Sequence, residues 1–166
     1  MKPNDPRATS GLQPLQDTNN ARNKSDYSDS QADSKYLILV ADDSADSLAM
    51  ISLYLQTEGY RVVTAANGED AIKVATQTNP SLILMDISMP TLDGLGATRR
   101  IREDPNLRSV PIIAVTAFGT EGFQRAAYDV GVSGYLTKPI ELDRMCNLIA
   151  RLLSPSVSGE LGAEKL

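Results

Sequence analysis

Carboxylate side chains end two separate apolar runs of the sequence. Asp42 and Asp43 follow the apolar residues 37–41, and Asp86 follows the apolar residues 82–85. Clustered carboxylates either bind a cation or shift their own protonation, and oxygen ligands without histidine or cysteine favour Mg²⁺. Helix capping is the plain alternative for the pair, because aspartate is a favoured N-cap residue. The residues alone leave both interpretations open.

A hydroxyl and an ammonium group end two further apolar runs. Thr116 follows residues 112–115, and Lys138, one of only two lysines between residues 36 and 154, precedes Pro139. The lysine could offset carboxylate repulsion and pair with a phosphate, and the hydroxyl could donate to a phosphoryl oxygen. An ordinary strand residue and a surface salt bridge are the alternatives. Together with the acids, these groups predict a site for a divalent cation and a phosphoryl group.

The sequence contains no histidine. This excludes Ser-His-Asp catalysis and histidine-ligated zinc. Asp86 is followed by the turn-rich loop 88–94, which is expected to keep its carboxylate exposed. Such a carboxylate beside Mg²⁺ could attack phosphorus and form an acyl phosphate. Any phosphohistidine donor must then belong to another molecule.

The runs that carry these groups alternate with helical patterns. Strands are predicted at 36–41, 61–65, 82–86, 110–115 and 134–137, and helices at 45–58, 69–78, 94–103, 121–129 and 141–153. Short apolar strands separated by helices form parallel sheets covered on both faces, so the sequence predicts a doubly wound α/β fold. Ligands bind at the carboxyl edge of such sheets, where the four runs above end.

Composition narrows the class of protein. The 166 residues suffice for one domain, with 42% apolar and 22% charged residues. The net charge of −5 argues against nucleic-acid binding, and the absence of a long apolar stretch argues against a membrane protein or a signal peptide. The single cysteine, Cys146, excludes an internal disulfide and fits the cytoplasm.

The two ends of the chain differ from its centre. Residues 1–34 are almost entirely polar and are predicted to be a disordered extension, because they offer too little apolar surface to offset the entropy of ordering. Residues 155–166 are predicted to be a loose tail. The predicted domain therefore spans residues 35–154.

Three other features are given ordinary interpretations. Gly94 and Gly96 lack the third glycine and the preceding strand of a dinucleotide-binding loop. The arginines of the third helix are expected to form a solvated face; they are Arg99, Arg100 and Arg102. Cys146 is expected at the core or its boundary.

Residues 36–154 resemble the receiver domain of two-component response regulators. The motifs that carry the resemblance are the pair Asp42-Asp43, the run ending at Asp86 with Met89-Pro90 and Asp93-Gly94 behind it, Thr116-Ala117, and the segment 135–139. The resemblance implies a flavodoxin-like, five-stranded parallel sheet of order 2-1-3-4-5 with helices on both faces. It also implies a cis peptide between Lys138 and Pro139.

The family's function is carried over as an expectation. A stand-alone response regulator would accept a phosphoryl group on Asp86 from a sensor histidine kinase or a histidine phosphotransfer protein. It would signal to a downstream effector protein through a phosphorylation-dependent surface formed by the fourth helix, fifth strand and last helix. It would be an autocatalytic phospho-acceptor rather than a turnover enzyme.

The resemblance also assigns roles at the site. Asp43, Asp86 and the carbonyl of Ser88 would bind Mg²⁺, and Asp42 would assist through a water molecule.

In the same family pattern, Thr116 and Lys138 would contact the phosphoryl group. Tyr135 would be the switch aromatic that responds with Thr116.

Two alternatives remain from the sequence. A phosphorylation-independent adaptor would keep the fold and bind its partners constitutively, indifferent to Asp86 and to Mg²⁺. An aspartyl phosphatase would need a second acid two residues after the first, where this chain has Ser88.

Overall fold

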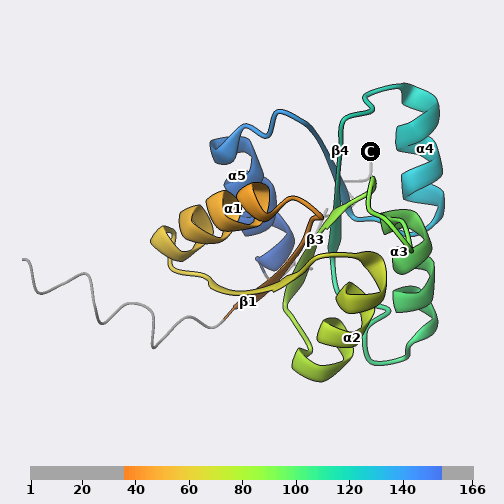
Figure 1. Ribbon diagram of the computed structural model, residues 1–166, viewed down its shortest axis with the longest axis horizontal. Helices are drawn as coiled ribbons and strands as arrows, with labels where there is room; N and C mark the ends of the chain where they lie inside the picture. The colour runs from red at the N-terminus through yellow and green to blue at the C-terminus, as the bar shows by residue number, and fades with distance from the viewer. Residues whose placement is uncertain (1–35, 155–166) are drawn as a thin grey trace, which may run out of the picture.

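A five-stranded parallel sheet lies between two layers of helices (Figure 1). The computed structural model describes residues 36–154. The strands are β1 (Leu37–Ala41), β2 (Arg61–Ala65), β3 (Leu82–Asp86), β4 (Ile112–Thr116) and β5 (Gly134–Thr137). The helices are α1 (Ala45–Thr57), α2 (Gly68–Thr78), α3 (Gly94–Glu103), α4 (Glu121–Asp129) and α5 (Leu142–Leu153). The predicted extension 1–34 and tail 155–166 fall outside the described residues.

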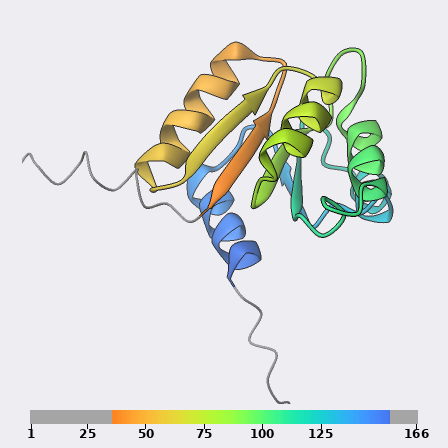
Figure 2. The same cartoon turned by 90° about the horizontal axis from the view of Figure 1, so that it is seen from below.

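The strand order β2-β1-β3-β4-β5 confirms the expected topology. Helices α2, α3 and α4 cover one face, and α1 and α5 cover the other (Figure 2). Successive residues of β1 alternate between two buried clusters, with Ile38 and Val40 in one and Leu39 in the other. Burial on both faces explains why the strands read as nearly continuous apolar runs. None of the helices within residues 36–154 has the length and apolar character needed to cross a membrane.

Element boundaries follow local chemistry. Helix α1 ends just before Gly59, whose φ of 87° is a left-handed conformation that glycine adopts without strain. Strand β4 begins at Ile112 rather than at Val110, where the sequence placed its start. The intervening Pro111 has no N–H to contribute to a strand ladder.

The expectation that all three arginines of α3 are solvated is wrong for Arg102. Its Nε and Nη2 donate to the Gly131 carbonyl at 2.9 and 2.8 Å, and its Nη1 donates to the Leu107 carbonyl at 3.3 Å. Burial lowers the pKa of this guanidinium. Arg102 lies in the last turn of α3 and reaches the loop after α4, whereas Arg99 and Arg100 are exposed. The C-terminal end of α4 is thereby tied to α3.

Replacing Arg102 with Gln should lower the free energy of unfolding by about 1–2 kcal/mol, because two half-buried carbonyls lose charged donors. The exposed Arg99 is a matched control, and Arg99→Gln should change stability by less than about 0.5 kcal/mol. Urea denaturation measures both variants. Equal effects of the two substitutions would contradict a structural role for the Arg102 contacts.

The single cysteine is placed as expected. Cys146 is partly buried on α5 and packs against the cluster between α5 and the sheet. Burial raises the pKa of its thiol from 9.0 to about 11, and nearby Glu58 and Asp143 add to the shift. At about pH 8 the thiolate fraction falls roughly a hundredfold relative to an unshifted thiol. Iodoacetamide should therefore alkylate the native protein about that much more slowly than the urea-unfolded chain, and equal rates would contradict this.

Candidate functional site

Three carboxylates converge at the carboxyl edge of the sheet. Strands β1 and β3 are neighbours with Ala41 opposite Met85, so the residues that follow lie side by side. One carboxylate oxygen from each of Asp42, Asp43 and Asp86 lies within 4.8 Å of the other two. Asp43 is exposed, whereas Asp42 and Asp86 are each only 2% exposed. The predicted clustering of these acids is present in the fold.

The capping alternative is wrong for both members of the acidic pair. The N-cap of α1 is Ser44, whose hydroxyl accepts from the Ser47 N–H at 3.3 Å. Asp42 lies before the cap and its Oδ1 accepts from the Ser44 N–H at 2.8 Å. That contact fixes the direction of the Asp42 side chain and leaves its other oxygen for the site.

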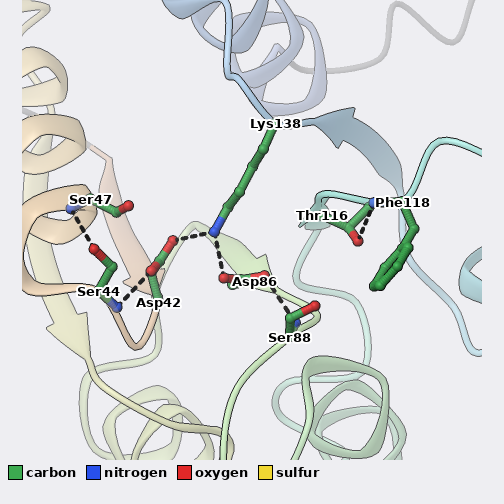
Figure 3. A network of polar contacts seen from close by, with 8 residues as sticks. All are labelled: Asp42, Ser44, Ser47, Asp86, Ser88, Thr116, Phe118 and Lys138. Atoms are coloured by element: carbon green, nitrogen blue, oxygen red, sulfur yellow. Dashed lines mark hydrogen bonds and ion pairs between the residues drawn. The ribbon is translucent and has the colours of Figure 1, made fainter.

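Lys138 joins the two buried carboxylates. Its Nζ lies 2.9 Å from Oδ2 of Asp42 and 2.6 Å from Oδ2 of Asp86 (Figure 3). The backbone of the lysine is fixed, because its N–H donates to the Thr116 carbonyl at 2.8 Å. Its peptide bond to Pro139 is cis, as expected. The ammonium is therefore aimed between the two acids rather than into solvent.

The protonation of Lys138 follows from these contacts. Burial is the largest single influence and lowers the pKa of the ammonium, but the hydrogen bonds to Asp86 and Asp42 and the negative charges of these two groups together outweigh it, so the pKa rises above 10.5. Because the folded-state pKa is raised, the stabilising contribution is fully present below pH 10.5 and is lost as pH rises through the folded-state value. At neutral pH the lysine is a fixed positive charge.

Asp86 is less exposed than the sequence suggested. It ends β3, the central strand, and is flanked by β1 and β4, so its neighbours cover it. Its Oδ1 accepts from the Ser88 N–H at 2.9 Å and its Oδ2 binds Lys138. Its carboxylate therefore lies in the floor of the acidic site, oriented from both sides.

Gly94 sets the position of the Asp86 backbone. A Cβ added at Gly94 would lie 2.1 Å from the Asp86 carbonyl oxygen, and the Gly94 N–H donates to the Ile87 carbonyl at 3.0 Å. The first turn of α3 thus lies directly against the strand end that carries the carboxylate.

Gly94→Ala should cost about 2–3 kcal/mol of stability, since backbone must move to admit the methyl group. A matched control is Gly122→Ala in α4, where the added Cβ meets nothing within 4 Å. There the helix should gain up to about 1 kcal/mol from the better helix former. Thermal unfolding compares them, and a neutral Gly94→Ala would rule out the close approach.

Thr116 lies at the same edge but outside the ion-pair network. It is fully buried, and its Oγ1 accepts from the Phe118 N–H at 3.1 Å (Figure 3). Tyr135 is also buried, and its hydroxyl donates to the Phe118 carbonyl. Burial raises the pKa of Tyr135, and the Thr116 hydroxyl partly opposes the shift. Both switch candidates therefore contact the backbone of one residue.

Sequence reasoning missed Phe118 and the role of Gly94. Phe118 acts through backbone atoms, so its residue type carries no signal, and only its place two residues after Thr116 could have pointed to it. Its side chain is half exposed and stacks on Phe123 with ring centroids 5.1 Å apart. The sequence pattern indicates only a turn at Gly94, and the strand packed against it is not visible in the sequence.

The donors present suit a hard divalent cation. The site offers carboxylate oxygens from three residues, and the described residues place no histidine or thiolate among them. Such all-oxygen sets favour Mg²⁺ over zinc or copper. Asp43 has the most accessible carboxylate, while Asp42 and Asp86 each share an oxygen with Lys138. Coordination by the Ser88 carbonyl stays a prediction.

Known proteins are similar to this chain over the part that contains the site residues. The family model described as the response regulator receiver domain matches residues 38–150. The polar-differentiation response regulator DivK of Brucella anthropi is 32% identical over 116 residues, which are 70% of this chain and 94% of DivK. All site residues described above fall within the matched range.

Two solved structures are similar over most of the described residues. The receiver domain of the sensor histidine kinase PA1611 from Pseudomonas aeruginosa, with a magnesium ion coordinated in its active-site cleft, has a TM-score of 0.69 and 34% identity, over 74% of this chain and 100% of that chain. The chemotaxis protein CheY4 of Vibrio cholerae has a TM-score of 0.69 and 28% identity, over 72% and 100% of the two chains.

Proposed function

Because the chain belongs to the response regulator receiver family of two-component signalling, we propose that Asp86 is the aspartate that accepts the phosphoryl group. The observation that carries this is the Lys138 ammonium, which binds both Asp86 and Asp42 at the strand ends. Asp86 is oriented from its other side by the Ser88 N–H. A carboxylate fixed beside a cation is placed to attack phosphorus, and catalysis is then positioning and charge neutralisation.

The donor is a phosphohistidine on a sensor histidine kinase or histidine phosphotransfer protein, since this chain has no histidine. An Asp86 oxygen attacks phosphorus, the phosphorus–nitrogen bond breaks, and the imidazole leaves with the electron pair and takes up a proton. Lys138 pairs with the negative oxygens of the transferring group. The Thr116 hydroxyl donates to one of them after leaving the Phe118 N–H.

Asp42, Asp43 and Asp86 would hold Mg²⁺, together with the Ser88 carbonyl. When bound, this ion would supply positive charge that offsets carboxylate repulsion and the charge on the phosphoryl oxygens. With Asp86 as its acceptor, the protein would act as a phospho-acceptor and signalling module rather than a turnover enzyme. We place it in the cytoplasm, with no direct role at nucleic acid or membrane.

Phosphorylation would be conveyed through Phe118. The new group adds a charge of about −1.5 to −2 at Asp86. Drawing Thr116 toward that charge would remove its acceptor from the Phe118 N–H. Because Tyr135 holds the Phe118 carbonyl, the β4–α4 loop and the Tyr135 ring would shift together. The face formed by α4, β5 and α5, where an effector protein docks, would change with them.

Incubation of the full chain with a small phosphodonor and Mg²⁺ tests the proposal. We expect labelling that approaches about one phosphoryl group per chain, needs Mg²⁺, and is released by hydroxylamine, as acyl phosphates are. Two results would contradict the proposal that Asp86 accepts the phosphoryl group. One is labelling that persists with EDTA, and the other is labelling that resists hydroxylamine, as a serine or threonine phosphate does. Continuous release of phosphate without a labelled intermediate would indicate a phosphatase instead.

A further inference from the structure

A groove of about 450 Å³ runs along the edge strand β5, between α4 and α5. Tyr128 of α4 forms one side, Tyr135 and Gly134 of β5 lie at its base, and α5 forms the other side. Helices α4 and α5 cover opposite faces of the sheet (Figure 1). The residues that line the groove belong to α4, β5, α5 and the residue before β5, and none of the three clustered carboxylates is among them.

The α5 side of the groove is basic. Arg144, Asn147 and Arg151 line it, and their spacing of three and four residues places them on one face of the helix. Both arginines are exposed, and neither forms an ion pair with any residue between 36 and 154. The neighbouring acid Asp143 instead accepts from the Tyr54 hydroxyl of α1 at 3.0 Å, on the other side of α5.

No acidic side chain of the described residues lines the groove, although the chain carries a net charge of −5. An acidic partner would be repelled by most of the surface and attracted here, which selects one orientation of approach. Two arginines that form no ion pair within residues 36–154 are too few for nucleic acid, which is held by many phosphate contacts. Strand β5 at the sheet edge also presents backbone groups that another polypeptide can pair with.

We propose that this groove binds an acidic polypeptide segment of a partner protein, with two carboxylates about 10 Å apart that pair with Arg144 and Arg151. The half-exposed ring of Tyr128 supplies apolar contact between them. The inference rests on the proposed function, because it names the partner of the phosphorylated form. Tyr135 couples the two sites: its ring lies in the groove and its hydroxyl holds the Phe118 carbonyl beside Thr116.

A displayed library of random linear peptides provides the probe. Binders are selected on the full chain with Mg²⁺ and beryllium fluoride, which mimics an acyl phosphate, and are resynthesised for anisotropy measurements. We expect paired Asp or Glu residues in the binders. Affinity should fall about tenfold in Arg144→Gln/Arg151→Gln and weaken with added salt. Binders without acids, no binders, or equal affinity for this double variant would overturn the proposal.

The double variant Arg99→Gln/Arg108→Gln is the matched control. It removes the same charge from two exposed arginines outside the groove and should bind the peptides as the wild type does. Equal losses in both variants would mean non-specific attraction and would also overturn the proposal. Asp86 labelling of the wild-type protein is measured in parallel. Normal labelling of Asp86 without peptide binding would contradict only the proposal for the groove. Absent labelling would contradict the proposed function.

Discussion

Asp86→Asn should reduce phosphoryl labelling at least about a hundredfold, which is about 2.7 kcal/mol in barrier height. An amide lacks the anionic oxygen that attacks phosphorus. The substitution keeps the shape of the side chain, and its oxygen can still accept from the Ser88 N–H. Lys138 also keeps its ion pair with Asp42. We therefore expect the stability of the variant to stay within about 1–2 kcal/mol of the wild type.

Asp129→Asn is the control for this experiment. Asp129 is an exposed aspartate at the end of α4, away from the site, and its replacement should leave labelling unchanged. Urea denaturation of each variant separates loss of chemistry from loss of fold. Full labelling of a folded Asp86→Asn protein would show that another residue accepts the phosphoryl group.

Lys138→Met should act on both labelling and stability. Loss of the ammonium removes a charge partner of the transferring group, and labelling should fall about a hundredfold. The two buried carboxylates then face each other without their shared cation, which should cost about 1–3 kcal/mol, since the lysine itself is 31% exposed. Added Mg²⁺ should restore more stability to this variant than to the wild type, because it offsets the same repulsion.

Lys73→Met is a matched control, since Lys73 is the other lysine between residues 36 and 154 and is exposed on α2. It should change neither labelling nor the response to Mg²⁺. If Lys138→Met and Lys73→Met have the same stability and the same labelling, the ion pairs of Lys138 contribute neither to phosphorylation nor to stability.

Most of the site could be predicted from the types of the residues that end the strands. Once apolar runs alternate with helices, parallel strands bring Asp42, Asp86, Thr116 and Lys138 to one edge, and the structure confirms that placement. The sequence could not distinguish the buried Asp42 from the exposed Asp43, because that depends on how Ser44 begins the helix.

Contacts between distant segments were not predictable. Arg99 and Arg102 are three residues apart and lie on the same side of α3, so the helical pattern does not separate them. The acceptor at Gly131, which distinguishes Arg102, comes from a loop beyond the next strand and helix. The contact of Gly94 with the Asp86 carbonyl likewise depends on the path of the intervening loop. Such contacts depend on how distant segments pack in three dimensions, and the local periodicity of the sequence does not predict that packing.

Borohydride reduction of the labelled protein tests the central claim most directly, because it converts an aspartyl phosphate to homoserine in place. Peptide mass spectrometry then identifies the modified position. We expect homoserine at position 86 and nowhere else, in an amount that matches the label. Homoserine at Asp42 or Asp43, or a labelled protein with no homoserine, would contradict the assignment of Asp86 as the phosphoryl acceptor.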